Sequence, residues 1–333
     1  MPLSIPKPPA VAGVDAVVIG RNEGARLIAC LTALRGQAGR IIYVDSGSTD
    51  GSAVAAEALG AEVVALDMAR PFTAARARNA GLMALALGGD ATEFVQMMDG
   101  DCALREGWLG AALAHLVAHP QAALVFGRRR ERFPEASVYN QLCDREWDVP
   151  LGEVRACGGD MLVRRAALAA VGGYRDDVIA AEDDELAQRL RAEGWTLWRI
   201  EAEMTWHDAA ILRFGQWWRR AVRAGHGFAQ VGSLHPGHFV PERRRVWFWG
   251  AALPLVFGLG LVLWPGAAVA VLGLYGLSGA RTAWRFWRGG MGLGRSMGCA
   301  GLITLSKLPN MQGMLTWFWR NHRGAGPRII EYK

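Results

Sequence analysis

Residues 15–51 read DAVVIGRNEGARLIACLTALRGQAGRIIYVDSGSTDG. The apolar run at 15–20 predicts a buried strand, and a helical stretch follows it at 25–34. The same order then returns, with a strand at 40–45, a polar loop, and a helix at 52–59. Strands that alternate with helices in this way predict a parallel sheet covered by helices.

The alternation continues beyond this stretch. It predicts a third strand at 62–66, a long helix at 73–87 and a fourth strand at 94–98 that ends at Asp99. Further helices are expected at 109–118 and 182–192, and further strands at 122–126 and 196–200. We therefore predict an α/β fold with a mostly parallel sheet, in which ligands bind outside the carboxyl ends of the strands.

Two carboxylates, Asp99 and Asp101, flank Gly100 directly after the fourth predicted strand. Oxygen ligands suit Mg²⁺ or Mn²⁺, and a cation held there together with phosphate oxygens would neutralise a diphosphate. The alternative is a solvated turn, because an Asp-x-Asp pattern also arises by chance. The position after a buried strand favours the metal site.

A loop of short polar residues follows the second predicted strand, beginning at Asp45 and ending at Gly51. Such side chains can hydrogen-bond a base or a ribose while the glycines provide the turns. The alternative for Asp45 and Asp50 is that they cap the next helix. We favour capping for Asp50.

The helix expected at 73–87 carries Arg76, Arg78 and Asn79 near its start. A cation at this place would complement the charge of bound phosphates. The alternative is a solvated helix face, and the residues alone leave both interpretations open.

Four acidic residues, Glu182 to Glu185, open the helix expected at 182–192. The helix dipole favours acids in a first turn, and Glu185 with Arg189 has the spacing of an ordinary ion pair, so some of these acids are expected to be structural. A carboxylate at a helix start that lines the cleft can also be the general base that a hydroxyl group needs.

The order and spacing of five motifs resemble the family 2 glycosyltransferases over residues 14–230. The motifs are VVIGRNE at 17–23, VDSGSTDG at 44–51, ARNAG at 77–81, DGD at 99–101, and EDDEL with a following RL at 182–190. The resemblance implies a GT-A fold, inversion at the anomeric carbon, a nucleoside diphosphate sugar donor, and dependence on Mg²⁺ or Mn²⁺.

The resemblance also implies roles for single residues. Asp45 contacts the base or ribose of the donor. Asp101 holds the metal together with Asp99, which also borders the donor. Asp183 is the base that activates the acceptor, and Glu182 is its neighbour in the site.

Four more residues are placed in the same way. Arg78 and Asn79 face the donor in the nucleotide pocket, and Gly159 lies in a loop that lines the sugar and the acceptor. His207 is a further metal ligand, and the alternative is a histidine whose hydrogen bonds are satisfied near a sheet edge.

Residues 216–220, QWWRR, are similar to the Gln-x-x-Arg-Trp element of processive synthases, but no Trp follows the Arg. An interfacial amphipathic helix is the better interpretation of that segment.

Charge is unevenly distributed along the 333 residues. Residues 243–333 hold 12 Lys and Arg and one acid, whereas residues 1–242 hold 25 Lys and Arg and 30 acids. The basic excess therefore lies beside an apolar segment, where it favours membrane lipids as a partner and argues against nucleic acid.

The five cysteines form no CxxC pair, which is typical of a reduced, cytoplasmic protein. Residues 20–24 lack the G-x-G-x-x-G spacing of a dinucleotide-binding enzyme.

The apolar segment sets the domain organisation that we predict. Residues 1–13 form a Pro-rich leader that does not resemble a secretory signal, and residues 14–242 form the GT-A domain. Residues 243–333 form a membrane-associated helical hairpin with a basic amphipathic tail. Its two apolar stretches are 246–263 and 267–280, and Trp264-Pro265-Gly266 is the turn between them. The alternatives are a hairpin that enters the bilayer without crossing it and a buried hairpin in a soluble oligomer.

Together these features predict an inverting, metal-dependent hexosyltransferase at the cytoplasmic face of the cell membrane. It would move a sugar from a nucleoside diphosphate to a hydroxyl of a lipid-linked or glycan acceptor, in envelope polysaccharide or glycolipid biosynthesis. The alternative is a non-catalytic subunit of an envelope assembly that binds nucleotide sugars or serves as a scaffold.

Overall fold

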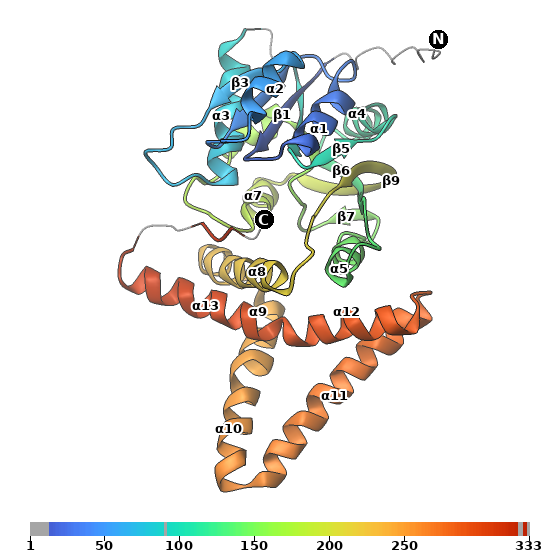
Figure 1. Ribbon diagram of the computed structural model, residues 1–333. Coiled ribbons are helices and arrows are strands. Elements are labelled where there is room, and N and C mark those ends of the chain that lie inside the picture. The colour runs from blue at the N-terminus through green and yellow to red at the C-terminus, as the bar shows by residue number, and fades with distance from the viewer. Residues whose placement is uncertain (1–12, 90–91, 326–328, 332–333) are drawn as a thin grey trace. The chain divides into compact units, whose positions relative to one another are not determined.

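The computed structural model describes residues 13–89, 92–325 and 329–331 (Figure 1). The predicted leader at 1–13 lies outside the described residues except for Gly13. The chain divides into two compact units. The first comprises the residues up to Arg132 together with Asp144–Ala209, and the second comprises Phe133–Cys143 together with the residues from Ala210 onward.

The first unit is built on one mixed sheet, in which the strand order is β3-β2-β1-β4-β8-β6-β9-β5 and β7 pairs with β9. The strands are β1 Val14–Gly20, β2 Ile41–Asp45, β3 Glu62–Ala65, β4 Phe94–Asp99, β5 Cys102–Leu104, β6 Ala122–Glu131, β7 Gly152–Val154, β8 Met161–Arg164 and β9 Thr196–His207. Strands β1 to β4 pair in parallel, as do β6 and β9, whereas β5, β7 and β8 join the sheet antiparallel to their neighbours. The predicted α/β fold is confirmed.

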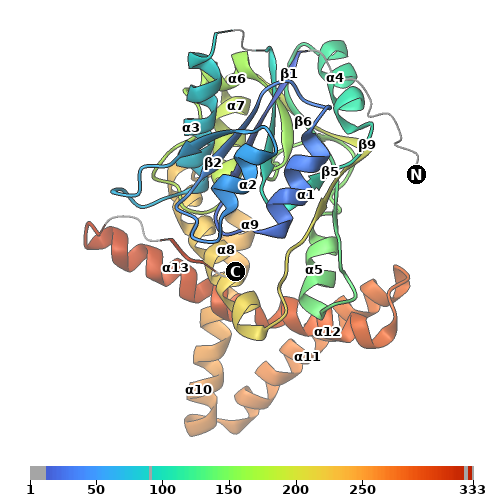
Figure 2. The same ribbon diagram turned by 45° about the horizontal axis from the view of Figure 1, so that its top comes forward.

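Helices cover both faces of this sheet. They are α1 Ala25–Leu34, α2 Ser52–Ala58, α3 Ala74–Leu87, α4 Trp108–Ala118, α6 Arg165–Ala170 and α7 Glu182–Ala192. Figure 2 shows α3 on the face opposite α1. Helix α3 approaches β1 closely at Gly81, where an added Cβ would overlap the side chain of Val17. This close approach brings the first turn of α3, with Arg78, toward the carboxyl end of the parallel strands.

The second unit is helical. Its helices are α5 Val138–Glu146, which extends into the first unit, α8 Phe214–Leu234, α9 Val240–Trp247, the π-helical turn η1 Phe248–Ala252, α10 Leu253–Leu263, α11 Pro265–Arg288, α12 Leu293–Leu305 and α13 Lys307–His322. Helices α8 and α13 cross at glycines, because a Cβ at Gly225 would overlap the carbonyl of Asn310 and one at Gly313 would overlap the carbonyl of Val222. The indole of Trp218 donates to Gln312 at 2.9 Å across the same pair.

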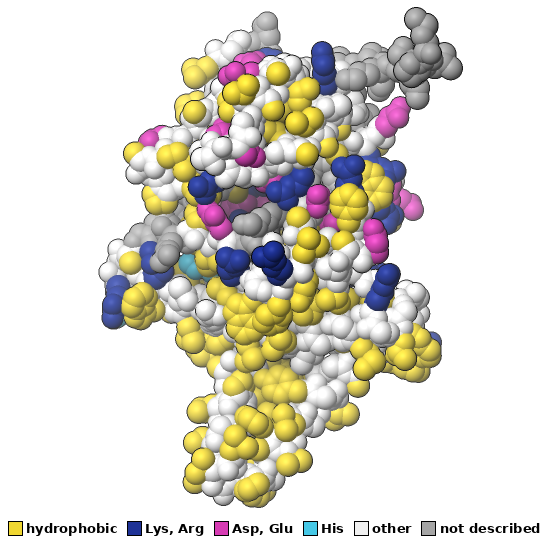
Figure 3. All heavy atoms as spheres, in the orientation of Figure 1, with side chains coloured by type: hydrophobic (Ala, Val, Ile, Leu, Met, Phe, Trp, Pro, Cys, Tyr) yellow, Lys and Arg dark blue, Asp and Glu magenta, His cyan; other side chains and the backbone are white. Residues whose placement is uncertain are grey.

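Helices α10 and α11 form a hairpin, and the chain reverses at Trp264, whose backbone is extended (Figure 1). Pro265 then occupies the first position of α11, where its missing N–H costs nothing. Large apolar side chains on both helices are exposed and form the yellow surface over them in Figure 3, among them Leu255, Leu259 and Val262. Within the described residues one helix, Val240–Leu263, is long and apolar enough to cross a membrane.

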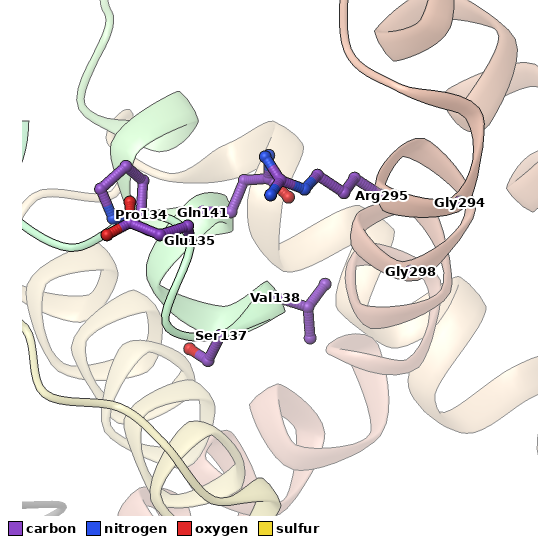
Figure 4. A pocket seen from close by; sticks show the side chains of 8 residues that line it. All are labelled: Pro134, Glu135, Ser137, Val138, Gln141, Gly294, Arg295 and Gly298. Carbon is purple, nitrogen blue, oxygen red and sulfur yellow. The ribbon is translucent and has the colours of Figure 1, made fainter.

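A pocket of 270 Å³ opens in the second unit between the segment that begins α5 and helix α12 (Figure 4). Arg295 extends from α12 toward Gln141 and Glu135. Because Arg295 and Glu135 carry opposite charges, the lining favours neither an anion nor a cation. We assign no ligand to this pocket.

Candidate active site

The register of the parallel strands gathers the predicted site residues at one edge of the sheet. Gly20 at the end of β1 lies opposite Asp45 of β2 on one side, and Ile19 lies opposite Asp99 of β4 on the other. The loops that follow these strands therefore leave the sheet side by side, as expected for carboxyl ends of parallel strands.

Asp45 organises the loop that follows β2. Its carboxylate accepts hydrogen bonds from the Tyr43 hydroxyl at 3.0 Å and from the backbone N–H groups of Gly47 and Ser48 at 3.1 and 2.9 Å. Asn22 ties the loop after β1 to this one, because its side-chain oxygen accepts from the N–H of Thr49 at 2.7 Å. The two loops are thereby held in a fixed relation to each other.

Asp50 lies at the start of α2. Its carboxylate accepts from both the N–H and the hydroxyl of Ser52, at 3.0 and 2.6 Å. This geometry agrees with a structural role for Asp50 at the helix terminus.

Arg78 is the centre of a buried cluster of charges. Its guanidinium group contacts Asp99 at 2.9 Å, Glu182 at 2.6 Å and Asp183 at 3.3 Å, and the Arg78 side chain is only 2% exposed. Burial alone would lower the pKa of Arg78, but the charges of Asp183 and Asp99 hold it above its usual value. The cluster joins the start of α3, the end of β4 and the start of α7.

Asp183 is a buried carboxyl group whose pKa is raised. Burial raises its pKa well above the ordinary value, and the charges of Glu182 and Asp99 add to this, while Arg78 opposes it. None of the described residues donates a hydrogen bond to Asp183 Oδ1, which is buried. The contact that this oxygen makes is the ion pair with Arg78 Nη1 at 3.3 Å.

Glycine at position 159 makes room for the cluster. A Cβ there would overlap the Arg78 guanidinium and would come within 3.0 Å of Asp99 Oδ2, whereas a Cβ at Gly158 would meet nothing closer than 3.8 Å. The Gly159 backbone thus lies directly against the charged groups, and its predicted position beside the donor and the acceptor stays a prediction.

Asn79 forms hydrogen bonds with the segment at 174–176. Its amide donates to the Tyr174 carbonyl at 2.8 Å and to Asp176 at 2.9 Å, and its oxygen accepts from the Tyr174 N–H at 2.9 Å. These bonds hold the segment at 174–176 against α3. The donor contact that we predicted for Asn79 stays a prediction.

Asp101 and His207 meet at the end of β4 and β9. The Nε2 atom of His207 lies 3.1 Å from Asp101 Oδ2, and both side chains are buried. Burial, with the positive charge of Arg129, lowers the pKa of His207 to about 4, so the imidazole is neutral near pH 7. A neutral imidazole beside a carboxylate is a donor set that Mn²⁺ accepts and that suits Mg²⁺ less well.

Asp99 contacts two arginines. Besides Arg78, Arg129 approaches Asp99 at 3.8 Å and Asp160 at 3.1 Å. The group of possible ligands that lie within 4.8 Å of one another contains Asp101, Cys102 and His207. The residues present thus fit a divalent cation at Asp101 and His207, and the metal contact of Asp99 stays a prediction.

Two residues that we did not predict, Arg129 and Trp147, lie beside the site together with Asp160, which belongs to the predicted loop at 158–160. Arg129 stacks over Trp147 at 5.6 Å, and Trp147 contacts the His207 ring edge-on at 4.5 Å. Asp160, which is buried, accepts from the backbone of Asp99 at 3.1 Å and from the Thr205 hydroxyl at 3.0 Å. Burial would lower the pKa of Arg129, but Asp160 and Asp99 hold it above its usual value. A permanent cation therefore lies between the carboxylates.

Family models and curated relatives match this chain. The family model of Glycosyl transferase family 2 matches residues 15–168, and that of Glycosyl transferase family 21 matches residues 148–241. A pre-mycofactocin glycosyltransferase of Mycobacterium tuberculosis, in strains CDC 1551 and H37Rv, is 30% identical over 251 residues, which are 71% of this chain and 51% of the relative. The chain therefore spans about half the length of the curated relatives it matches.

Solved structures give the same class of fold. The mannosyltransferase PcManGT from Pyrobaculum calidifontis, solved in complex with GDP-Man and Mn²⁺, superposes with a TM-score of 0.57 at 19% identity, over 91% of each chain. The fold is therefore the GT-A fold of nucleotide-sugar-dependent transferases. The chain belongs to the family 2 glycosyltransferases, as the five motifs predicted.

Proposed function

We propose that this protein transfers a hexosyl group from a nucleoside diphosphate sugar to a hydroxyl group, with inversion at the anomeric carbon. The observation that carries the proposal is the buried cluster in which Arg78 contacts Asp99, Glu182 and Asp183. It combines a carboxylate of raised pKa with a fixed positive charge at the ligand-binding edge of the sheet.

Each part of the cluster has a task in this reaction. Asp183 takes the proton of the acceptor hydroxyl as its oxygen attacks the anomeric carbon, and the bond from that carbon to the diphosphate breaks on the opposite face. Glu182 and Arg78 fix the position of Asp183. Asp45, Asn79 and Arg78 border the donor, and Gly159 lets the sugar approach the charged groups.

A divalent cation, Mg²⁺ or Mn²⁺, would be held by Asp101 and His207, with Asp99 as a further predicted ligand. Bound there, it would neutralise charge on the departing diphosphate. Arg129 lies between Asp99 and Asp160 and places a second positive charge at the same edge of the sheet. The imidazole in the donor set supports Mn²⁺ in particular.

The membrane part of the proposal rests on the second unit. The helix Val240–Leu263 has sufficient length, and the α10–α11 hairpin exposes a continuous set of large apolar side chains. Basic residues flank the hairpin at Arg243, Arg244 and Arg245 and again at Arg281, Arg285 and Arg288, which favours ends on the cytoplasmic side. We propose that residues 14–242 form the catalytic region at the cytoplasmic face and that residues 243–333 attach it to the membrane.

A lipid-linked or glycan acceptor in envelope polysaccharide or glycolipid biosynthesis is consistent with that attachment. The mycobacterial relatives are named for pre-mycofactocin, so this compound belongs in a panel of acceptors. Purified full-length protein in detergent would be incubated with radiolabelled nucleotide sugars, Mn²⁺, and lipid extract, glycan or pre-mycofactocin acceptors. We expect a labelled product whose anomeric configuration is opposite to that of the donor.

The Asp183→Asn variant separates this proposal from a non-catalytic nucleotide-sugar-binding subunit. We expect the variant to bind donor and to form no product. Donor binding without product formation by the unaltered protein, across the whole panel, would favour the non-catalytic subunit instead.

A further inference from the structure

Cys102 lies beside the Asp101–His207 pair as a consequence of strand pairing. It begins β5, and in the antiparallel register with β9 it lies directly opposite His207. Asp101 precedes it in the chain, and the Cys102 thiol donates to Asp101 Oδ1 at 3.6 Å. A thiol, an imidazole and a carboxylate therefore offer ligand atoms that all lie within 4.8 Å of one another.

The spacing of these atoms suits a small tetrahedral ion. Zinc binds sulfur at about 2.3 Å and nitrogen or oxygen at about 2.0 to 2.2 Å, so its tetrahedral ligand atoms lie roughly 3.3 to 3.7 Å apart. The Cys102 sulfur lies 3.6 Å from Asp101 Oδ1, and the Nε2 atom of His207 lies 3.1 Å from Asp101 Oδ2, the other oxygen of the same carboxylate. One ligand atom from each residue lies within 4.8 Å of the others, so small side-chain movements would bring them around such an ion.

The chemical types of the ligands also distinguish between cations. Thiolate sulfur selects zinc and other soft ions, whereas Mg²⁺ and Mn²⁺ prefer oxygen. All three side chains are buried, and the cysteine is 1% exposed. A soft ion bound there would be shielded from water, and its binding would release the thiol proton to solvent.

We propose that Cys102 is a third ligand of the Asp101–His207 site and that Zn²⁺ binds there in competition with the activating Mg²⁺ or Mn²⁺. The proposal rests on the metal site of the proposed function and adds its regulation. Three protein ligands leave a tetrahedral ion one open position, whereas an octahedral ion held by two ligands keeps several for phosphate oxygens. Zinc is therefore an inhibitor of the proposed transfer.

Cadmium titration of the full-length protein tests the ligand directly, because cadmium–thiolate bonds absorb in the ultraviolet and need no donor or acceptor. Cys102→Ser is the test variant. Cys30→Ser is the matched control, since Cys30 is also buried near the site and its thiol donates to the Asp99 carbonyl at 3.8 Å. We expect one equivalent of absorbing cadmium in the unaltered protein and in Cys30→Ser, and none in Cys102→Ser. Equal absorption in Cys102→Ser, or none in the unaltered protein, would overturn the proposal.

Zinc X-ray absorption on the unaltered protein is a second measurement, and it tests the proposal even if Cys102→Ser does not fold. We expect one sulfur at about 2.3 Å with nitrogen and oxygen neighbours, and a shell without sulfur would contradict the proposal. In competition titrations the preference for Zn²⁺ over Mn²⁺ should fall about 10-fold or more in Cys102→Ser.

These binding measurements do not depend on catalytic activity. Failure of glycosyl transfer with a normal cadmium signal would count against the proposed function alone, and the reverse result would count against the role of Cys102 alone.

Discussion

The first unit buries charged side chains, whereas the hairpin of the second unit exposes apolar ones. Each is the reverse of the usual distribution, in which charged side chains are exposed and apolar side chains are buried. In the first unit Arg78, Glu182 and Asp183 place charges out of water, where each charge needs a partner, and Asp99 is partly exposed beside them. In the second unit, helices α10 and α11 leave Leu, Val and Trp side chains exposed. Neither arrangement is expected of an ordinary soluble surface or core. The proposed donor site would account for the first arrangement, and the proposed membrane attachment would account for the second.

The largest effect should come from removing the central cation of the cluster. Arg78→Met leaves three carboxylates near one another without their shared partner, so we expect a loss of about 3 to 5 kcal/mol in stability and loss of activity. Thermal unfolding of the full chain in detergent measures the stability. Arg175→Met is the control, because Arg175 pairs with Asp177 at the surface and should change stability by at most about 1 kcal/mol. Equal losses of stability in Arg78→Met and Arg175→Met would show that burial of the cluster does not determine its contribution to stability.

A more selective change keeps the cluster and removes only the proposed base. Asp183→Asn should lower the turnover number by about 10²- to 10⁴-fold, the usual contribution of general base catalysis. Donor affinity, measured by calorimetry, should change little, and Asp184→Asn should keep most of the turnover. A normal turnover number in Asp183→Asn would remove that residue from the mechanism.

The hairpin side of the comparison is tested by placing charges on its exposed apolar surface. Leu255→Arg and Leu259→Arg should each weaken membrane attachment by about 2.5 to 3.5 kcal/mol if these positions lie in hydrocarbon. Flotation with lipid vesicles measures attachment. Val54→Arg is the control, since Val54 is 70% exposed on α2 of the first unit. If the hairpin variants float as well as the control, the apolar surface has another partner.

The smallest expected effect is also the most local. Gly159→Ala adds a Cβ that overlaps the Arg78 guanidinium, which should cost about 1 to 3 kcal/mol and raise the KM for the donor. Gly158→Ala, one residue earlier, has room for its Cβ and should behave like the unaltered protein. The same KM in both variants would mean that this backbone does not approach the donor.

Much of the fold could be predicted because apolar periodicity marks buried elements. Helix α1 begins and ends where we expected, and β1 and β2 differ by one residue from the prediction. Strands β6 and β9 run further than predicted, to Glu131 and His207, because their last parts are charged. There Arg130 and Glu203 pair with each other at 2.6 Å, so charge replaces the apolar pattern. Helix α11 likewise continues beyond Ala280 to Arg288, since hydropathy detects an apolar run and not the end of a helix.

The site could be predicted only in part. Ordered motifs pointed to Asp45, Arg78, Asp101 and Asp183; Asp45 ends β2, Asp101 follows β4, and Arg78 and Asp183 lie near the starts of α3 and α7. The role of Arg129 was not predictable, because it lies in a run of three arginines on β6. Irregular pairing with β9 between Phe126, Arg128 and Arg129 breaks the alternation of faces, so the sequence does not tell which arginine points inward. The contacts of Cys102 depend on strand pairing over a separation that no local pattern reveals.

The most direct test of the account is the release of nucleoside diphosphate from a panel of nucleotide sugars, with and without Mn²⁺, by the full-length protein and by Asp101→Asn. We predict that at least one donor is consumed only when the metal is present and that Asp101→Asn is slower by about 10² to 10³-fold, the effect of several kcal/mol of lost charge stabilisation. Consumption that is equal without metal or equal in Asp101→Asn, or no consumption of any donor, would contradict the account.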